Sequence, residues 1–174
     1  QPGTRRASGI AASCTLRRSR SSATPTLAIA QVAELQALPQ SMHVLQTYIV
    51  EDSPVIRENL IATLEELVPV RVVGSAEDEA TALRWLGAPG QRVDLVIVDL
   101  FLKRGSGLGV LRSAQALHPH YRLVVLSNFA TPDMRRTCLA LGADRVFDKS
   151  TEIDALVLYC EQLAAGEGPP LAAP

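Results

Sequence analysis

The chain has 174 residues, 47% of them apolar and 20% charged, which suits one packed domain and is too short for two. Seventeen basic and eighteen acidic residues give a formal charge of −1, which gives no reason to expect a nucleic-acid or membrane-surface protein. The charge is uneven: residues 1–42 carry five arginines and one glutamate, so the rest of the chain is acidic.

Residues 1–42 are expected to be a disordered or non-native extension. Residues 1–26 are rich in Ser, Thr, Arg, Ala and Gly and have no periodic apolar pattern, so burial would not offset the cost of ordering them. Two other interpretations stay open, an organelle transit peptide and an arginine run that touches nucleic acid without sequence preference. Residues 27–38 fit a short amphipathic helix, and Met42 is a candidate for the biological start.

From His43 onward, apolar runs alternate with segments of helical period. Five apolar runs are predicted to be strands: 44–50, 70–73, 93–100, 123–126 and 145–147. The run VDLVIVDL at 93–100 is apolar on both faces, as a central parallel strand covered by helices must be.

Helix-start signals separate these strands. In chain order they are Ser53 with Pro54, Ser75 with Asp78, Gly107, Thr131 with Pro132, and Ser150 or Thr151. Five strand–helix units in about 120 residues favour an open, doubly wound five-stranded parallel sheet, because an eight-stranded barrel needs roughly twice that length. We expect this α/β domain to span residues 43–165, followed by a disordered tail at 166–174.

Cysteine and hydropathy patterns narrow the class of protein further. Cys14, Cys138 and Cys160 have no CxxC spacing and are odd in number, so they predict neither a zinc site nor a disulfide framework. We expect them to be small apolar fillers in a reducing compartment, the cytoplasm. No apolar run approaches the roughly 20 residues that cross a bilayer, so no membrane partner is expected.

Polar residues stand at or near the carboxyl ends of four of the predicted strands. These strand ends form the edge at which such sheets bind ligands. Glu51 and Asp52 follow the first strand, Asp99 lies near the end of the third, Ser127 follows the fourth and Lys149 the fifth. Like charges about 4 Å apart repel by roughly 4 kcal/mol at an effective dielectric near 20, so three converging carboxylates need a cation. Oxygen-only ligands that leave room for water and a phosphoryl oxygen favour Mg²⁺ over Ca²⁺.

The combined pattern resembles the receiver domain of two-component response regulators. The likeness covers about residues 43–164 and is carried by YIVEDSPVIRENL, VDLVIVDLFLKRGSGLGVL, VVLSN and GADRVFDKS. It implies a flavodoxin-like sheet of order 2-1-3-4-5 and a phosphoryl group transferred to Asp99 by a histidine kinase or phosphotransfer protein. It also implies that Mg²⁺ is held by Glu51, Asp52, Asp99 and the backbone carbonyl of Phe101.

The resemblance implies that the side chains of Ser127 and Lys149 contact the phosphoryl group. A hydroxyl and an ammonium group are both chemically suited to this. Asp99 is the nucleophile, while Mg²⁺ and Lys149 stabilise charge on the transferred oxygens. The acyl phosphate adds negative charge, and Ser127 is expected to move inward and donate a hydrogen bond to it.

Some positions depart from the family pattern. Val146 stands where Tyr or Phe is common, and the period of a strand puts the neighbouring Phe147 on the opposite face, so Phe147 does not replace it. Ser150 replaces a frequent Pro, and we expect a trans peptide bond before it. Lys103 occupies another common Pro position. Asn128 and Phe129 follow Ser127 where small residues are frequent, so the access of water and the lifetime of the phosphoryl group are expected to differ from the family pattern, in a direction that the sequence leaves open.

The predicted function is a phosphorylation-controlled interaction module rather than an enzyme. It would signal to a downstream protein target or form a phosphorylation-dependent homodimer, without direct nucleic-acid binding. About ten residues follow the last predicted helix, so no output domain is expected, since a helix-turn-helix needs roughly 50–60 more residues. A fragment of a longer DNA-binding response regulator is the alternative.

Three other classes of protein fit the sequence less well. A Mg²⁺-dependent aspartyl-phosphate phosphatase or phosphotransferase usually has a second acid two residues after the first, where this chain has Phe101. A receiver-like domain that takes no phosphate is disfavoured because every charged member of the site is present. A flavin or nucleotide site is disfavoured because the acidic EDSPV run would repel phosphate.

Overall fold

The computed structural model describes residues 43–117 and 121–167. Their elements are β1 (Leu45–Val50), α2 (Pro54–Leu67), β2 (Val70–Ala76), α3 (Glu79–Leu86), β3 (Leu95–Val98), α4 (Gly107–Leu117), β4 (Arg122–Ser127), α5 (Pro132–Ala140), β5 (Arg145–Asp148) and α6 (Ile153–Ala164). The strands in this part pair in parallel in the order β2-β1-β3-β4-β5. The predicted α/β fold and strand order are therefore confirmed.

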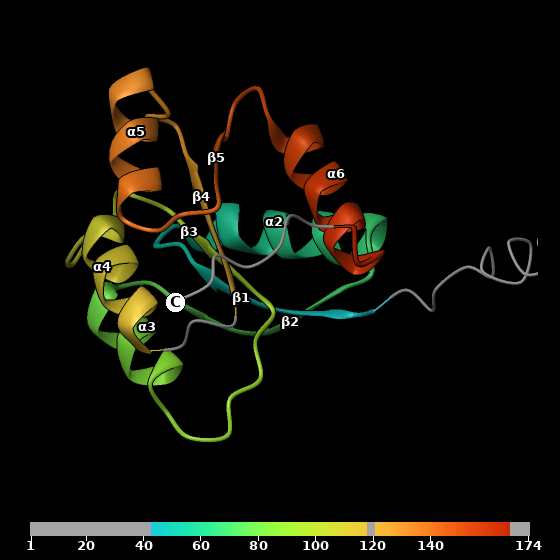
Figure 1. The fold of residues 1–174 in the computed structure, drawn as a ribbon, viewed down its shortest axis with the longest axis horizontal. Coiled ribbons are helices and arrows are strands. Elements are labelled where there is room, and N and C mark those ends of the chain that lie inside the picture. The colour runs from blue at the N-terminus through green and yellow to red at the C-terminus, as the bar shows by residue number, and fades with distance from the viewer. Residues whose placement is uncertain (1–42, 118–120, 168–174) are drawn as a thin grey trace, which may run out of the picture. The chain divides into compact units, whose positions relative to one another are not determined.

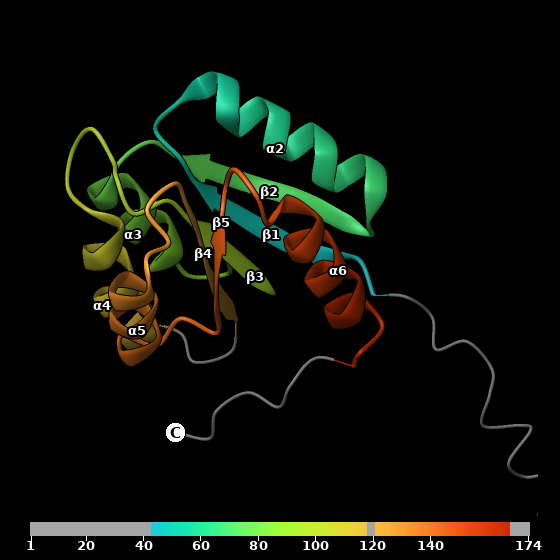
Figure 2. The same ribbon diagram turned by 90° about the horizontal axis from the view of Figure 1, so that it is seen from above.

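Helices cover both faces of this sheet, α2 and α6 on one and α3, α4 and α5 on the other (Figures 1 and 2). Strand β3 shows how the sequence achieves this, because all four of its residues are buried. Leu95 and Ile97 belong to the core under α2 and α6, whereas Val96 and Val98 belong to the core under the other three helices. The two-residue period of the strand thus supplies two separate cores.

The same alternation places Val146 and Phe147, neighbours in β5, on opposite faces of the sheet. Val146 packs in the core under α3, α4 and α5, and Phe147 packs in the core under α2 and α6. The Phe147 ring lies 6.0 Å from that of Tyr159 on α6, centroid to centroid. The prediction that Phe147 does not replace an aromatic residue at position 146 is confirmed.

Four helices begin at the predicted signals. Helix α4 begins at Gly107, and side chains cap the other three. Ser53 accepts a hydrogen bond from the Ile56 N–H at 3.5 Å, and Thr131 and Asp78 cap α5 and α3 in the same way. Ser75 is not part of a cap, because β2 continues through it to Ala76.

The predicted cap of α6 is wrong. The N-cap position belongs to Glu152, whose side chain makes no capping hydrogen bond, rather than to Ser150 or Thr151. Those two residues instead form a turn in which the Asp148 carboxylate accepts from the Ser150 N–H at 2.8 Å. As predicted, the peptide bond before Ser150 is trans.

Several expectations concern the limits of the chain. The expected extension at 1–42, with Cys14, and residues 168–174 of the expected tail lie outside the described residues.

Cys138 and Cys160 are free and buried, as fillers should be. No helix in the described part of the chain is long and apolar enough to cross a membrane.

Candidate functional site

The carboxyl ends of four strands bring the predicted site residues to one edge of the sheet. Glu51 and Asp52 follow β1, Asp99 follows β3 directly, and Lys149 follows β5. Ser127 is the last residue of β4 rather than the residue after it. They meet because parallel strands joined by helical crossovers all end on the same side of the sheet.

The Lys149 ammonium bridges two of the carboxylates. Its Nζ donates to Glu51 Oε2 at 2.5 Å and to Asp99 Oδ2 at 2.7 Å. All three side chains are at most 10% exposed. Burial by itself would lower the pKa of Lys149, but the hydrogen bonds and the attraction of the two carboxylates outweigh it and hold that pKa above its usual 10.5. Lys149 is therefore a charged residue at the centre of the site.

Glu51, Asp52 and Asp99 form a cluster suited to a cation. Each offers a carboxylate oxygen, and these oxygens all lie within 4.8 Å of one another. One bridging ammonium does not balance three carboxylates, so a negative charge is left to attract a cation. A donor set made only of oxygen fits a hard divalent ion such as Mg²⁺.

Ser127 is fully buried beside this cluster. Its hydroxyl oxygen accepts a hydrogen bond from the Phe129 N–H at 3.4 Å, within the loop that leads to α5. A movement of this hydroxyl therefore involves the loop as well.

The chain also matches a known family. Residues 47–161 fit the family model of the response regulator receiver domain. The chain belongs to that family. The predicted receiver fold, strand order and two-component regulatory class are thus shown.

Individual relatives support this assignment. A probable transcriptional regulatory protein of Picosynechococcus sp. is 32% identical over 120 residues, or 66% of this chain and 47% of that protein. A LuxR-family two-component response regulator from Aurantimonas sp. SI85-9A1 superposes with a TM-score of 0.64 at 22% identity, covering 74% of this chain and 91% of that one.

A second solved structure is a response regulator protein from Burkholderia pseudomallei with a phosphorylated aspartic acid, calcium ion and citrate. It superposes with a TM-score of 0.58 at 26% identity, covering 71% of this chain and 69% of that one. The curated relatives are longer proteins, because the alignments span only 27% to 58% of their lengths.

Two basic residues of the receiver site were not predicted from the sequence. Arg57 on α2 donates through Nη1 to the carbonyl of Glu51 at 2.9 Å, and Lys103 Nζ donates to the carbonyl of Asp52 at 3.2 Å. Both hold the main chain of the acidic pair. Both lie within segments that carry the family resemblance, but the sequence gives them no role, because a side chain that binds a backbone carbonyl can do so beside any residue type.

The backbone of Phe101 lies next to the Asp99 side chain. The Phe101 N–H donates to Asp99 Oδ1 at 3.4 Å. The residues Phe101 and Phe129 are 53% and 56% exposed, and their rings pack against each other with centroids 4.6 Å apart. The residues two positions after Asp99 and two positions after Ser127 therefore contact each other.

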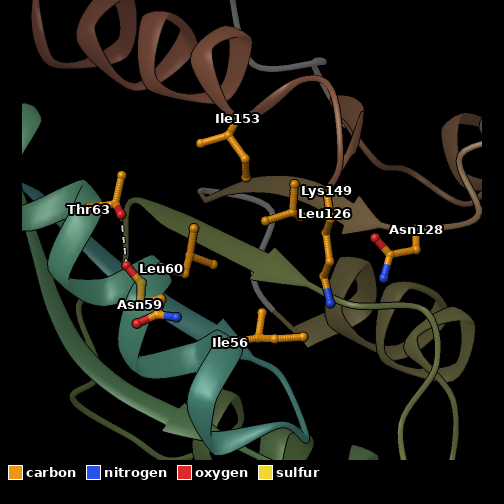
Figure 3. A pocket seen from close by; sticks show the side chains of 8 residues that line it. All are labelled: Ile56, Asn59, Leu60, Thr63, Leu126, Asn128, Lys149 and Ile153. Atoms are coloured by element: carbon orange, nitrogen blue, oxygen red, sulfur yellow. Dashed lines mark hydrogen bonds between the residues drawn. The ribbon is translucent and has the colours of Figure 1, made fainter.

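A pocket of about 340 Å³ lies on the α2 and α6 side of Lys149. Figure 3 shows Ile56 and Leu60 of α2 across this pocket from Leu126 and Ile153, with Lys149 along one side. None of the three clustered carboxylates lines it. The pocket is thus a neighbour of the receiver site and separate from the cation cluster.

Proposed function

We propose that this receiver accepts a phosphoryl group on Asp99 from a histidine kinase or phosphotransfer protein, and that Mg²⁺ assists the transfer. The observation that carries the proposal is the Lys149 ammonium 2.7 Å from Asp99, inside a cluster of three carboxylates. Glu51, Asp52, Asp99 and the Phe101 carbonyl would hold the ion, which when bound supplies positive charge to the phosphoryl oxygens.

Asp99, Lys149 and Ser127 each have a different role in the transfer. An Asp99 oxygen forms the new bond to phosphorus while the bond to the donor nitrogen breaks, and that nitrogen keeps the electron pair. Lys149, already beside Asp99, stabilises negative charge on the transferred group. The Ser127 hydroxyl exchanges its loop contact for a hydrogen bond to the acyl phosphate, which carries about two negative charges.

The phosphorylated aspartic acid and calcium ion of the Burkholderia pseudomallei relative support this proposal, since they pair the same chemistry with a divalent cation. Buried, unpaired Cys138 and Cys160 agree with a reducing compartment, and we infer that the exchange takes place in the cytoplasm. The output is a protein–protein contact with a target or a second copy, and the receiver is not itself an enzyme that releases a product.

We also propose that residues 43–165 fold without residues 1–42. The described sheet, both cores and the site residues all lie within residues 43–165. A chain that starts at Met42 should keep the melting temperature and Mg²⁺ affinity of the full chain. A melting temperature lower by several degrees would contradict this boundary.

The function is tested by incubating the protein with acetyl phosphate, with and without Mg²⁺, and measuring the intact mass. We expect a gain of one phosphoryl group that requires Mg²⁺ and that Asp99→Asn abolishes. Asp133→Asn is the matched control, because Asp133 is an exposed carboxylate on α5, and it should be labelled like the original chain. Labelling of the Asp99→Asn protein, or none of the original, would contradict the proposal.

A further inference from the structure

Glu79, the first residue of α3, holds the loop that follows Asp99. Its Oε2 accepts a hydrogen bond from the Ser106 N–H at 2.8 Å, and its own N–H donates to the Arg104 carbonyl at 3.3 Å. The bond to Ser106 crosses 27 positions of sequence. It joins α3 to α4, which lie side by side in Figures 1 and 2.

Two glycines make room for this side chain. A Cβ on Gly105 would lie 2.5 Å from the Cβ of Glu79, and Gly105 also has a φ of +80°, which side chains rarely adopt. A Cβ on Gly109, in the first turn of α4, would lie 2.2 Å from Glu79 Oε1. The carboxylate thus occupies the space that ordinary residues would fill at both positions.

The charge of Glu79 suits this place. Its carboxylate lies at the amino end of α4, where free N–H groups and the helix dipole favour a negative charge. Ser106 caps the same end from within the chain by accepting from the Leu108 N–H at 3.1 Å. Glu79 therefore fixes the start of α4 from a neighbouring helix.

The start of α4 in turn rests on the backbone of Asp99. The Gly107 N–H donates to the Leu100 carbonyl at 3.0 Å. A Cβ on Gly107 would lie 2.1 Å from the Asp99 carbonyl oxygen, so no other residue allows the helix so close. Any shift of the first turn of α4 therefore reaches the Asp99–Leu100 peptide directly.

We propose that Glu79 is a positioning residue for phosphoryl transfer: through Ser106 and α4 it fixes the main chain from Asp99 to Phe101, including the carbonyl offered to Mg²⁺. This inference rests on the proposed function. Glu79 itself touches neither the transferred group nor the ion. Its effect is to keep the acceptor and the carbonyl in the geometry that transfer needs, as outer partners of a metal site do.

Three variants separate this role from a simple effect on stability. Glu79→Ala removes the carboxylate. Gly109→Ala keeps the Glu79 residue but puts a methyl group where its Oε1 lies, so the carboxylate must move. Alanine favours a helix more than glycine does, so the variant does not weaken α4 itself. Glu79→Gln keeps an oxygen that accepts from Ser106. Glu77→Ala is the control, because it removes the same charge from an exposed position two residues away.

Three quantities are measured on the full chain. They are the Mg²⁺ affinity by calorimetry, the rate of labelling by acetyl phosphate, and the amide chemical shifts of residues 99–101. Glu79→Ala and Gly109→Ala should each weaken Mg²⁺ binding and slow labelling by about tenfold or more, as loss of an outer partner typically does. The amide signals of residues 99–101 should move in both. Glu79→Gln should stay within about threefold of the original chain, and Glu77→Ala should match it.

The outcomes distinguish this inference from the proposed function. If the original chain is not labelled, the proposed function fails, and the amide shifts still decide whether Glu79 positions the loop. If the original chain is labelled and Glu79→Ala and Gly109→Ala match it in Mg²⁺ affinity, labelling rate and the signals of residues 99–101, the positioning role is refuted. A lower melting temperature in Glu79→Ala with unchanged Mg²⁺ affinity and labelling would also refute it.

Discussion

The ring of Phe101 packs against the ring of Phe129, with centroids 4.6 Å apart and planes tilted by 53°. Each ring stands two residues after a member of the site, Asp99 in one case and Ser127 in the other. Both rings are more than half exposed, so the pair lies at the surface beside the acceptor rather than in a core. We expect the ring pair to hinder the approach of water to an acyl phosphate on Asp99.

Phe129→Ala should therefore shorten the lifetime of the phosphorylated protein. Ring pairs of this kind are worth about 0.5–1.5 kcal/mol, which corresponds to a hydrolysis rate higher by roughly two- to tenfold if the pair must open for water. The decay of the phosphorylated mass with time measures this rate. Leu139→Ala, which shortens a half-exposed apolar side chain on α5, should leave this rate unchanged. An equal or slower decay in Phe129→Ala would show that the rings do not shield the site.

Lys149→Met tests the balance of charge in the site. Without the ammonium, the buried Glu51 and Asp99 carboxylates lose their shared partner, and breaking a buried pair typically costs about 3–5 kcal/mol. The variant should melt at a lower temperature than the original chain in the absence of Mg²⁺. Saturating Mg²⁺ should recover more stability in the variant than in the original, because the ion replaces the missing positive charge. Equal stabilisation of both proteins by Mg²⁺ would contradict binding at these carboxylates.

Much of this site could be predicted from the sequence, because a polar residue at the end of an apolar parallel strand has its place fixed by topology alone. Asp99 and Lys149 are such residues, 50 positions apart and joined by a hydrogen bond. Strand limits were less certain, since pairing decides them: β2 runs on to Ala76 because Ser75 and Ala76 pair with Ile49 and Val50.

Contacts made across loops could not be predicted. Lys103 and Glu79 bind backbone groups 51 and 27 positions away, and nothing in the local pattern of either residue marks its partner. The α6 cap was misassigned for a related reason. The Asp148 side chain accepts from the Ser150 N–H, so the helix begins one or two residues later than a cap at Thr151 or Ser150 would place it.

Arg135 on α5 offers a route for the signal that does not need an aromatic residue at position 146. Its guanidinium donates to the Ala130 carbonyl, to the Val146 carbonyl and to Glu152 Oε2, the last at 2.6 Å. It thereby links the loop that starts at Ser127 to β5 and to the start of α6. A loop that moves with Ser127 must pull on this link.

Arg135→Ala should uncouple the surface formed by α5, β5 and α6 from the acceptor. In the original chain, beryllofluoride with Mg²⁺, a mimic of the acyl phosphate, should shift amide signals across residues 127–160 and increase association with a partner or a second copy. In Arg135→Ala the shifts should be confined to residues around Asp99. Arg136→Ala is the control, since this exposed neighbour pairs with Asp133 of its own helix. Identical shifts in both variants would exclude Arg135 as the link.

The same link has a predictable dependence on pH. The hydrogen bond from Arg135 and that from the Asp148 N–H hold the pKa of Glu152 below its usual 4.5. A lowered carboxyl pKa gives stability that is fully present above 4.5 and is lost as the pH falls through the lowered value. Glu152→Gln should therefore melt below the original chain at neutral pH, and the difference should shrink as the pH falls below 4.5. A difference that persists or grows in acid would contradict an ionised Glu152 in this link.

Asp99 is the proposed acceptor, and locating the acyl phosphate in the chain tests this most directly. The protein is treated with acetyl phosphate and Mg²⁺ and reduced with borohydride, which converts an aspartyl phosphate to homoserine, and its peptides are sequenced by mass spectrometry. We predict homoserine at position 99, dependent on Mg²⁺ and absent when acetyl phosphate is omitted. Homoserine at Asp52 or Asp94 with an unmodified Asp99, or no homoserine in the chain, would contradict the account.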